Sequence, residues 1–156
     1  ERYDTNPLSV IMYNFGMFFL DEKTRYDAER VEKLENIAFY GLQFGDDAKD
    51  LDAYTACENV RSLANDLGGF DHTAAIIEQM DVVLSIDTYI VHLAGAMNIP
   101  AWIMLPYTPD WRWFLDRSDT PWYPGSRLFR QQAPGDWASV IDAIRPELEI
   151  LIAQNR

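Results

Sequence analysis

The chain has 156 residues and a formal net charge of −12 at pH 7, from 13 basic and 25 acidic side chains. Its length fits one domain, and 48% hydrophobic with 24% charged residues excludes a disordered or collagen-like chain. The acidic balance disfavours nucleic acid or anionic lipid as partners, because both require a basic face. A local basic pocket for a small phosphorylated ligand is compatible with this negative net charge. We therefore expect a single domain over residues 1–156.

Cysteine use and hydropathy favour a cytoplasmic protein. The single cysteine, Cys57, excludes an intrachain disulfide and suits a reducing compartment. The sequence starts at Glu1 without a recognisable signal peptide, and we expect further chain upstream of it. Asn98 and Pro100 interrupt the least charged stretch, Tyr89–Tyr107, which predicts a buried helix and strand rather than a membrane span.

Apolar runs alternate with amphipathic segments in the first half of the chain. Leu8–Phe15 is apolar and β-branched, which predicts a buried strand. Apolar residues spaced by three predict a helix within Asp21–Glu35. Ile37–Leu42 predicts a second strand, followed by a short acidic helix that ends near Tyr54. A short third strand is expected over Asn59–Ala64.

The second half shows the same alternation more clearly. Strand and helix patterns in turn predict a doubly wound, mainly parallel sheet flanked by helices, a Rossmann-like α/β fold. A proline within the last helix, Pro146, is expected to kink or split it. The predicted elements are a helix over Thr73–Met80, a strand over Val82–Ile86, a helix over Tyr89–Met97, a strand over Ala101–Leu105, a loop over Pro106–Gly125, a short strand over Arg127–Arg130 and a helix over Asp136–Ile152.

The sharpest local motif is SIDTYIVH at residues 85–92. It places Asp87 and Thr88 between a strand end and a helix N-terminus, where free backbone N–H groups and the helix dipole attract anions. His92 follows Thr88 by about one turn on the same helix face. Two interpretations stay open. The three residues bind a phosphate, or Asp87 and Thr88 only cap the helix and His92 is a core histidine.

Other candidate groups carry less. His72 lies near a predicted helix start, and two scattered histidines without a Cys/His cluster do not predict a metal site. No glycine-rich phosphate loop is present. The loop expected over Pro106–Gly125, called the Trp-rich loop below, contains Trp111, Trp122 and the charged Arg112. This loop forms a wall of a ligand cleft, or it is pinned to its own domain by aromatic anchors.

A longer stretch, Phe70–Gln131, closely resembles the C-terminal half of heptosyltransferase-like glycosyltransferases of family nine. The likeness is strongest to bacterial members that follow tetratricopeptide repeats. Tyr40–Gln43 also resembles the Ser-Leu-Gln strand end of that family. The motifs that carry the resemblance are HTAA at 72–75, SIDT at 85–88, HLAGA at 92–96, PDWRW at 109–113, WYP at 122–124 and LFRQ at 128–131.

The resemblance implies one half of a GT-B fold, the half that binds a nucleoside diphosphate sugar. It implies no metal and no cofactor, with the sugar nucleotide as substrate and an N-terminal half or repeat domain as partner. In place of the phosphate loop of the family, this sequence has Asn14–Arg25. The implied site consists of Asp87, Thr88, Tyr89 and His92 at the diphosphate, with Lys23 or Arg25 beside it, Gln43 facing the nucleotide, and Trp111 and Arg112 as a cleft wall.

Three functions follow. The first is the donor-binding part of an inverting, metal-independent glycosyltransferase that needs a second half for activity. The second is a catalytically inactive binding or scaffold module, which the divergent Asn14–Arg25 loop motivates. The third is another sugar-nucleotide enzyme, such as an epimerase of GT-B shape.

Overall fold

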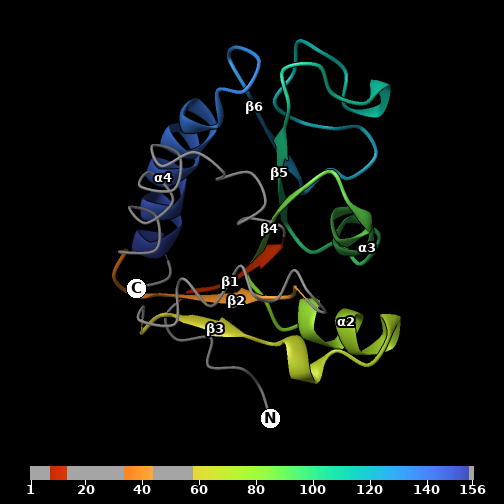
Figure 1. The fold of residues 1–156 in the computed structure, drawn as a ribbon, viewed down its shortest axis with the longest axis vertical. Helices are drawn as coiled ribbons and strands as arrows, with labels where there is room; N and C mark the ends of the chain where they lie inside the picture. The colour runs from red at the N-terminus through yellow and green to blue at the C-terminus, as the bar shows by residue number, and fades with distance from the viewer. Residues whose placement is uncertain (1–7, 14–33, 44–57, 155–156) are drawn as a thin grey trace.

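The computed structural model describes residues 8–13, 34–43 and 58–154, and at its centre lies a six-stranded sheet (Figure 1). Every pairing between these strands is parallel, in the order β3-β2-β1-β4-β5-β6. The chain thus winds outward in opposite directions from β1 and β4, which confirms the doubly wound, Rossmann-like α/β class. The strands are β1 (Leu8–Tyr13), β2 (Ile37–Gly41), β3 (Val60–Ser62), β4 (Val82–Ile86), β5 (Ala101–Leu105) and β6 (Arg127–Arg130).

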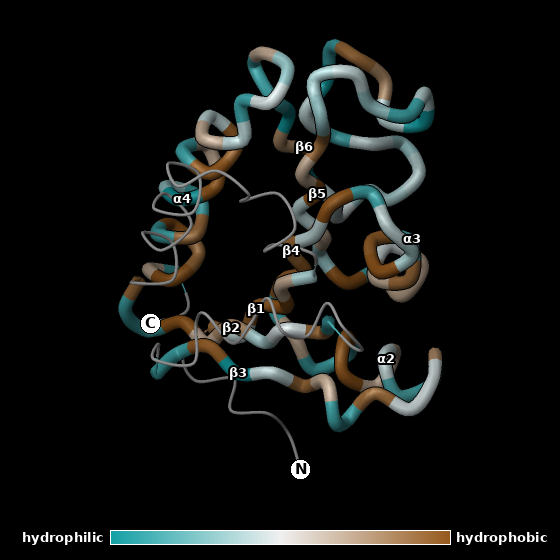
Figure 2. Tube along the Cα trace, viewed as in Figure 1, coloured by the Kyte–Doolittle hydropathy of each residue, from teal (hydrophilic) through white to brown (hydrophobic). Residues whose placement is uncertain are grey.

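Helices cover both faces of the sheet, with α2 and α3 on one side and α4 on the other (Figure 1). Hydrophobic and hydrophilic segments alternate along α4, as expected of a helix that presents one face to a sheet (Figure 2). The described helices are α2 (Phe70–Ile77), α3 (Tyr89–Ala96) and α4 (Trp137–Gln154), with 3₁₀ turns η3 (Ala64–Asp66) and η4 (Trp111–Trp113).

Strand β1 shows why the apolar runs form the middle of the sheet. Its consecutive residues Val10 and Ile11 are both fully buried, and they point to opposite faces because side chains alternate along a strand. Val10 belongs to the core under α4 with Ile144, whereas Ile11 belongs to the core under α3 with Ile90. A strand covered on both faces needs a nearly continuous apolar sequence, and this pattern made β1, β4 and β5 recognisable.

The strand predictions hold in the second half with unchanged bounds, and in the first half with small shifts. The second strand ends at Gly41, and the third covers only Val60–Ser62 before η3 begins. The first strand is described as far as Tyr13, and its predicted end at Phe15 lies outside the described residues.

Helix α2 begins three residues earlier than predicted and ends at Ile77. Its first backbone hydrogen bond joins the amide of Thr73 to the carbonyl of Gly69 at 3.1 Å, and the Thr73 hydroxyl donates to the same carbonyl. His72 therefore lies within the first turn instead of in front of the helix. The residues after Ile77 continue as turns, with the Met80 amide bonded to the Ile77 carbonyl.

Helix α4 is one helix that continues through Pro146, so the expected split is wrong. Ile144 and Leu148, on either side of the proline, are both fully buried against the sheet. Burying each aliphatic side chain contributes about 2 kcal/mol, which offsets the roughly 3 kcal/mol that an interior proline costs.

The outermost described strands are short. Strand β3 has three residues and β6 has four. The guanidinium of Arg127, the first residue of β6, lies over the rings of Trp102 and Phe129 at 5.8 and 5.4 Å. It also forms two hydrogen bonds with Glu147 of α4, one of them 2.9 Å long. This ion pair ties α4 to the edge of the sheet.

Several predictions fall on residues outside the described part: most of the helix over Asp21–Glu35, the acidic helix that ends near Tyr54, and the positions of Lys23, Arg25 and Cys57. Within residues 8–13, 34–43 and 58–154, no helix combines the length and the apolar character that crossing a bilayer requires.

Candidate nucleotide-binding site

The carboxyl ends of β1 and β4 form the point at which the sheet changes its winding direction. Tyr13, the last residue of β1, pairs in register with Ser85 near the end of β4. The chain leaves these two strands in opposite directions, toward β2 and toward β5. In open α/β sheets this divergence leaves a crevice where ligands bind. The motif SIDTYIVH runs from β4 across this edge into α3.

The N-terminus of α3 has no side-chain cap. Thr88 occupies the N-cap position with an extended backbone, and its side chain accepts no hydrogen bond from the first turn. The Thr88 hydroxyl instead lies 3.3 Å from that of Ser85, which donates to the carbonyl of Ile86. The expectation that Asp87 and Thr88 cap the helix through their side chains is therefore wrong. Consequently, no side chain caps the positive end of the α3 dipole, and the amide of Val91 in the first turn donates to the carbonyl of Thr88, at 3.2 Å.

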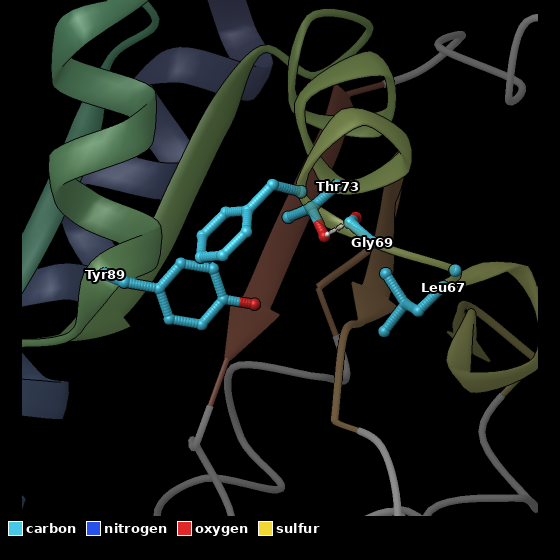
Figure 3. Close-up of a pocket in the computed structure, with 6 residues that line it drawn as sticks. Leu67, Gly69, Thr73 and Tyr89 are labelled. Atoms are coloured by element: carbon cyan, nitrogen blue, oxygen red, sulfur yellow. Dashed lines mark hydrogen bonds between the residues drawn. The ribbon is translucent and has the colours of Figure 1, made fainter.

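A pocket of about 380 Å³ lies beside this terminus. In Figure 3, Tyr89 of α3 lies on one side of the pocket and Leu67 on the other, with Gly69 and Thr73 between them. Tyr89 makes edge-on contacts with the rings of Tyr13 and Phe70, at centroid distances of 5.9 and 5.2 Å. Because Phe70 is 71% exposed, the pocket has an apolar aromatic rim. The residues that line it are Leu67, Gly68, Gly69, Phe70, Thr73 and Tyr89.

Gln43 follows β2 at the same edge of the sheet and is 2% exposed. Neither its amide nitrogen nor its amide oxygen has a hydrogen-bond partner in the described structure. A buried polar group without a partner costs about 1–3 kcal/mol. An amide that carries such a cost is suited to recognise a ligand with its own donors and acceptors. Gln43 does not line the pocket beside Tyr89, although it lies at the same carboxyl edge.

His92 lies at the centre of a polar and aromatic cluster. Its Nδ1 atom is 2.9 Å from the hydroxyl of Tyr123, and its Nε2 atom is 3.6 Å from Oδ1 of Asp87. The imidazole stacks on the ring of Trp113, with 5.6 Å between centroids and 21° between planes. Its side chain is 40% exposed, so the interpretation of His92 as a core histidine is wrong. Tyr123 and Trp113 hold the ring so that Nε2 faces the N-terminus of α3.

The Trp-rich loop is pinned to its own domain by aromatic anchors, and part of it is exposed. Trp113 is fully buried and anchors the loop to its own domain. The ring of Tyr123 packs so closely on Gly95 of α3 that a Cβ atom at this position would lie within 2.8 Å of the ring. In contrast, Trp111 and Trp122 are 69% and 51% exposed. The loop is thus pinned by two aromatic residues and presents two others.

The exposed part of the loop lines a second pocket, of about 360 Å³, together with His92 of α3. The predicted wall residues Trp111 and Arg112 meet here, with the Arg112 guanidinium 4.9 Å from the Trp111 ring. The backbone N–H of Arg112 donates to Asp110, and this bond lowers the pKa of that carboxyl from its ordinary value of 3.8. The lining residues are His92, Trp111, Arg112, Trp122 and Tyr123.

The structure thus brings most of the predicted site residues to one edge of the sheet. Thr88 and Tyr89 begin α3, Asp87 precedes it, and His92 follows one turn later. Sequence reasoning missed the pairing of His92 with Tyr123. The two residues are 31 positions apart, so no local pattern connects them. The WYP string at 122–124 was the only feature of the sequence that pointed to Tyr123.

The sequence matches no protein-family model and no curated protein. Among solved structures, the chain is similar to the E. coli heptosyltransferase WaaC with ADP, at 15% identity and a TM-score of 0.61, over 94% of this chain and 45% of that one. It is also similar to a family 9 glycosyltransferase from Veillonella parvula, at 12% identity and a TM-score of 0.60, over 97% and 48%. A third is the UDP-GlcNAc 2-epimerase of Neisseria meningitidis bound to UDP-GlcNAc, at 13% identity and a TM-score of 0.60, over 94% and 37%.

These likenesses establish the fold. The chain spans less than half the length of each of the three structures. Its six-stranded parallel sheet with flanking helices has the Rossmann-like arrangement that it shares with part of each of these structures. The linkage to tetratricopeptide repeats stays a prediction.

Proposed function

We propose that this chain is the donor-binding half of an inverting glycosyltransferase, which transfers a sugar from a nucleoside diphosphate sugar to an acceptor hydroxyl. The observation that carries the proposal is the N-terminus of α3, which no side chain caps and whose residues Tyr89 and His92 each line a pocket. Free amides, a helix dipole and an imidazole together suit a diphosphate. The fold shared with WaaC, whose structure contains ADP, supports the same assignment.

The role of this half follows from the charge that develops during transfer. The acceptor oxygen attacks the anomeric carbon, the bond from that carbon to the diphosphate oxygen breaks, and the hydroxyl proton goes to a base. The nucleoside diphosphate leaves with an added negative charge. The first-turn amides of α3 and the Nε2–H group of His92 stabilise this charge, as preorganised donors do. Lys23 or Arg25 would add cationic charge, so that the reaction needs no metal ion.

The remaining residues orient this machinery. Asp87 Oδ1, 3.6 Å from Nε2 of His92, favours the tautomer in which Nε2 carries the proton. The Tyr123 hydroxyl then donates to Nδ1. Gln43 supplies an amide for the nucleotide, and Tyr89 forms a wall of its pocket.

The acceptor site and the base belong, in this proposal, to a second half of the protein. A general base must lie within hydrogen-bond reach of the acceptor hydroxyl, and the residues at this edge are assigned to the leaving group. The partner half is the N-terminal domain, with or without helical repeats, that the family resemblance implies.

Ligand-induced stabilisation tests the proposal. We expect ADP, UDP or GDP at millimolar concentration to raise the melting temperature, because a ligand that binds only the folded state stabilises it. His92→Ala should reduce this shift. The control is Glu78→Ala, which changes an exposed residue at the C-terminal end of α2, away from the pocket, and should leave the shift unchanged. The absence of a shift with all three nucleotides would remove the support for a donor site.

A binding or scaffold module without catalysis is the second candidate, and the divergent sequence of Asn14–Arg25 favours it. An epimerase is the third, since a UDP-GlcNAc 2-epimerase shares the fold. Formation of a glycosylated acceptor together with free nucleoside diphosphate would exclude both. Transfer that is lost on Asp87→Ala or His92→Ala would identify this site as its centre.

A further inference from the structure

We propose that the pocket of about 360 Å³ between Trp111 and Trp122 binds the sugar ring of the nucleotide sugar. This inference rests on the proposed function and assigns a second subsite to it. The pocket combines the exposed faces of two indoles with a guanidinium, a phenol hydroxyl and an imidazole. A pyranose ring has the matching surface, because its C–H groups form apolar faces and its hydroxyls form a polar rim.

The walls of this pocket are held in place before any ligand binds. The indole N–H of Trp122 donates to the backbone carbonyl of Arg112 at 2.9 Å. The guanidinium of Arg112 donates to Asp110 at 2.7 Å and lies over the Trp111 ring. Each indole is thus connected to Arg112, while Trp111 and Trp122 remain 69% and 51% exposed. Preorganised walls reduce the entropy that binding would otherwise cost.

Polar groups are available beside these apolar faces. The Arg112 side chain is 48% exposed, so its charge is available to sugar hydroxyls or to a carboxyl substituent. His92 and Tyr123 form the side of the pocket nearest α3. An apolar pocket with a few convergent polar groups, of roughly 300–1,000 Å³, is typical of small-molecule sites.

The position of the pocket selects the sugar over other ligands. Apart from Tyr89, the residues of the first pocket follow β3, and apart from His92, the residues of the second pocket follow β5. Helix α3 contributes to both pockets, because its first residue, Tyr89, lines the first and His92, about one turn later, lines the second. A nucleoside diphosphate sugar has the same order of parts: a nucleoside, an anionic centre and a sugar bonded directly to it. One ligand therefore occupies both pockets with its diphosphate at α3.

The decisive measurement is the sugar increment, defined as the Kd of the nucleoside diphosphate divided by the Kd of its sugar conjugate. Calorimetric titrations would use the pairs UDP and UDP-GlcNAc, ADP and ADP-glucose, and GDP and GDP-mannose. For the pair that binds most tightly, we expect an increment of tenfold or more. Trp122→Ala and Arg112→Gln should each reduce it to below threefold and leave the Kd of the nucleoside diphosphate within twofold.

The matched control is Leu115→Ala, an exposed apolar residue of the same loop that does not line this pocket, and it should leave the increment unchanged. Trp111 and Trp122 are exposed, so their replacement should preserve the fold, which circular dichroism would verify. An increment near one in the unaltered protein, or one that survives both Trp122→Ala and Trp111→Ala, would overturn the proposal.

The failure of the proposed function is a separate outcome. If none of the three nucleoside diphosphates binds, the same protein is titrated with free glucose, N-acetylglucosamine and mannose, and indole fluorescence is recorded. A saturable change that Trp122→Ala abolishes supports a sugar site independent of nucleotides. The absence of any such change would overturn the inference as well.

Discussion

Replacing Gly95 by alanine is expected to destabilise the protein, although alanine is the better helix former. In an unobstructed helix interior, the change from glycine to alanine stabilises by about 1 kcal/mol. Here the added Cβ would lie 2.8 Å from Cδ2 of Tyr123 and closer still to two other ring atoms. The Tyr123 ring must move, because the new Cβ atom is fixed to the backbone of α3 and cannot move away from the ring.

The size of the effect follows from three contributions. Overpacking costs about 1–3 kcal/mol, and displacing Tyr123 from His92 loses a hydrogen bond of about 1 kcal/mol. After subtracting the gain in helix propensity, we expect Gly95→Ala to lower the free energy of unfolding by about 1–3 kcal/mol. For a chain of this length, each kcal/mol corresponds to a shift in melting temperature of about 2–4 °C.

Urea denaturation of four proteins would provide the test: the unaltered chain, Gly95→Ala, Tyr123→Ala and the double variant. In the Tyr123→Ala background the obstruction is gone, so Gly95→Ala should stabilise by about 1 kcal/mol. The reversal of sign corresponds to a coupling energy of about 2 kcal/mol or more. Stabilisation by Gly95→Ala in both backgrounds would refute the close packing of Tyr123 on α3.

Three further expectations concern α4. Pro146→Ala should raise the free energy of unfolding by about 1–3 kcal/mol in urea, because it restores a backbone donor inside the helix; a decrease would contradict this. Leu148→Ala should cost about 2–5 kcal/mol in the same assay, whereas Ile150→Ala, at a half-exposed position of the same helix, should cost under about 1 kcal/mol. The hydrogen bond from Arg127 lowers the pKa of the Glu147 carboxyl from its ordinary value of 4.5. The ion pair therefore stabilises the folded state fully above pH 4.5, and this stabilisation is lost as the pH falls through the lowered pKa. At this exposure it amounts to under about 1 kcal/mol. The stability difference between the unaltered chain and Glu147→Gln should thus shrink between pH 7 and pH 3, and a constant difference would show that the pair contributes nothing.

The fold could be predicted because burial on both faces of a parallel sheet leaves a strong sequence pattern. Ala101–Leu105 is a continuous apolar run and Val82–Ile86 is apolar except for Ser85, and the bounds of both agree with the structure. Helix ends were predicted less well. The start of α2 depends on a backbone bond to Gly69, and Phe70, Asp71 and His72 show no apolar periodicity that would place them in the helix.

The continuity of α4 through Pro146 could not be predicted from local preference alone. The helix is maintained by residues on both sides of the proline that pack against the sheet, and such packing is a property of the folded chain. Propensity therefore marks where a helix is weak, and tertiary contact decides whether it ends there.

The site divides in the same way. The anion-binding end of α3 follows from local order, since a strand, Asp87-Thr88 and a helix are consecutive in the chain. The setting of His92 does not, because its partner Tyr123 and its stacking neighbour Trp113 come from a distant loop. The missing side-chain cap at Thr88 was also invisible, since a threonine at an N-cap position normally accepts a helix amide.

The margins of the sheet have a consequence for assembly. A three-residue strand offers few backbone partners to an approaching chain. At the opposite margin, an intruding strand would have to displace a guanidinium already stacked on two rings and paired with a carboxylate. Short, charge-guarded borders of this kind resist lateral growth into fibrils. Within the part of the chain that the structure describes, both borders of the sheet therefore disfavour the addition of a further strand.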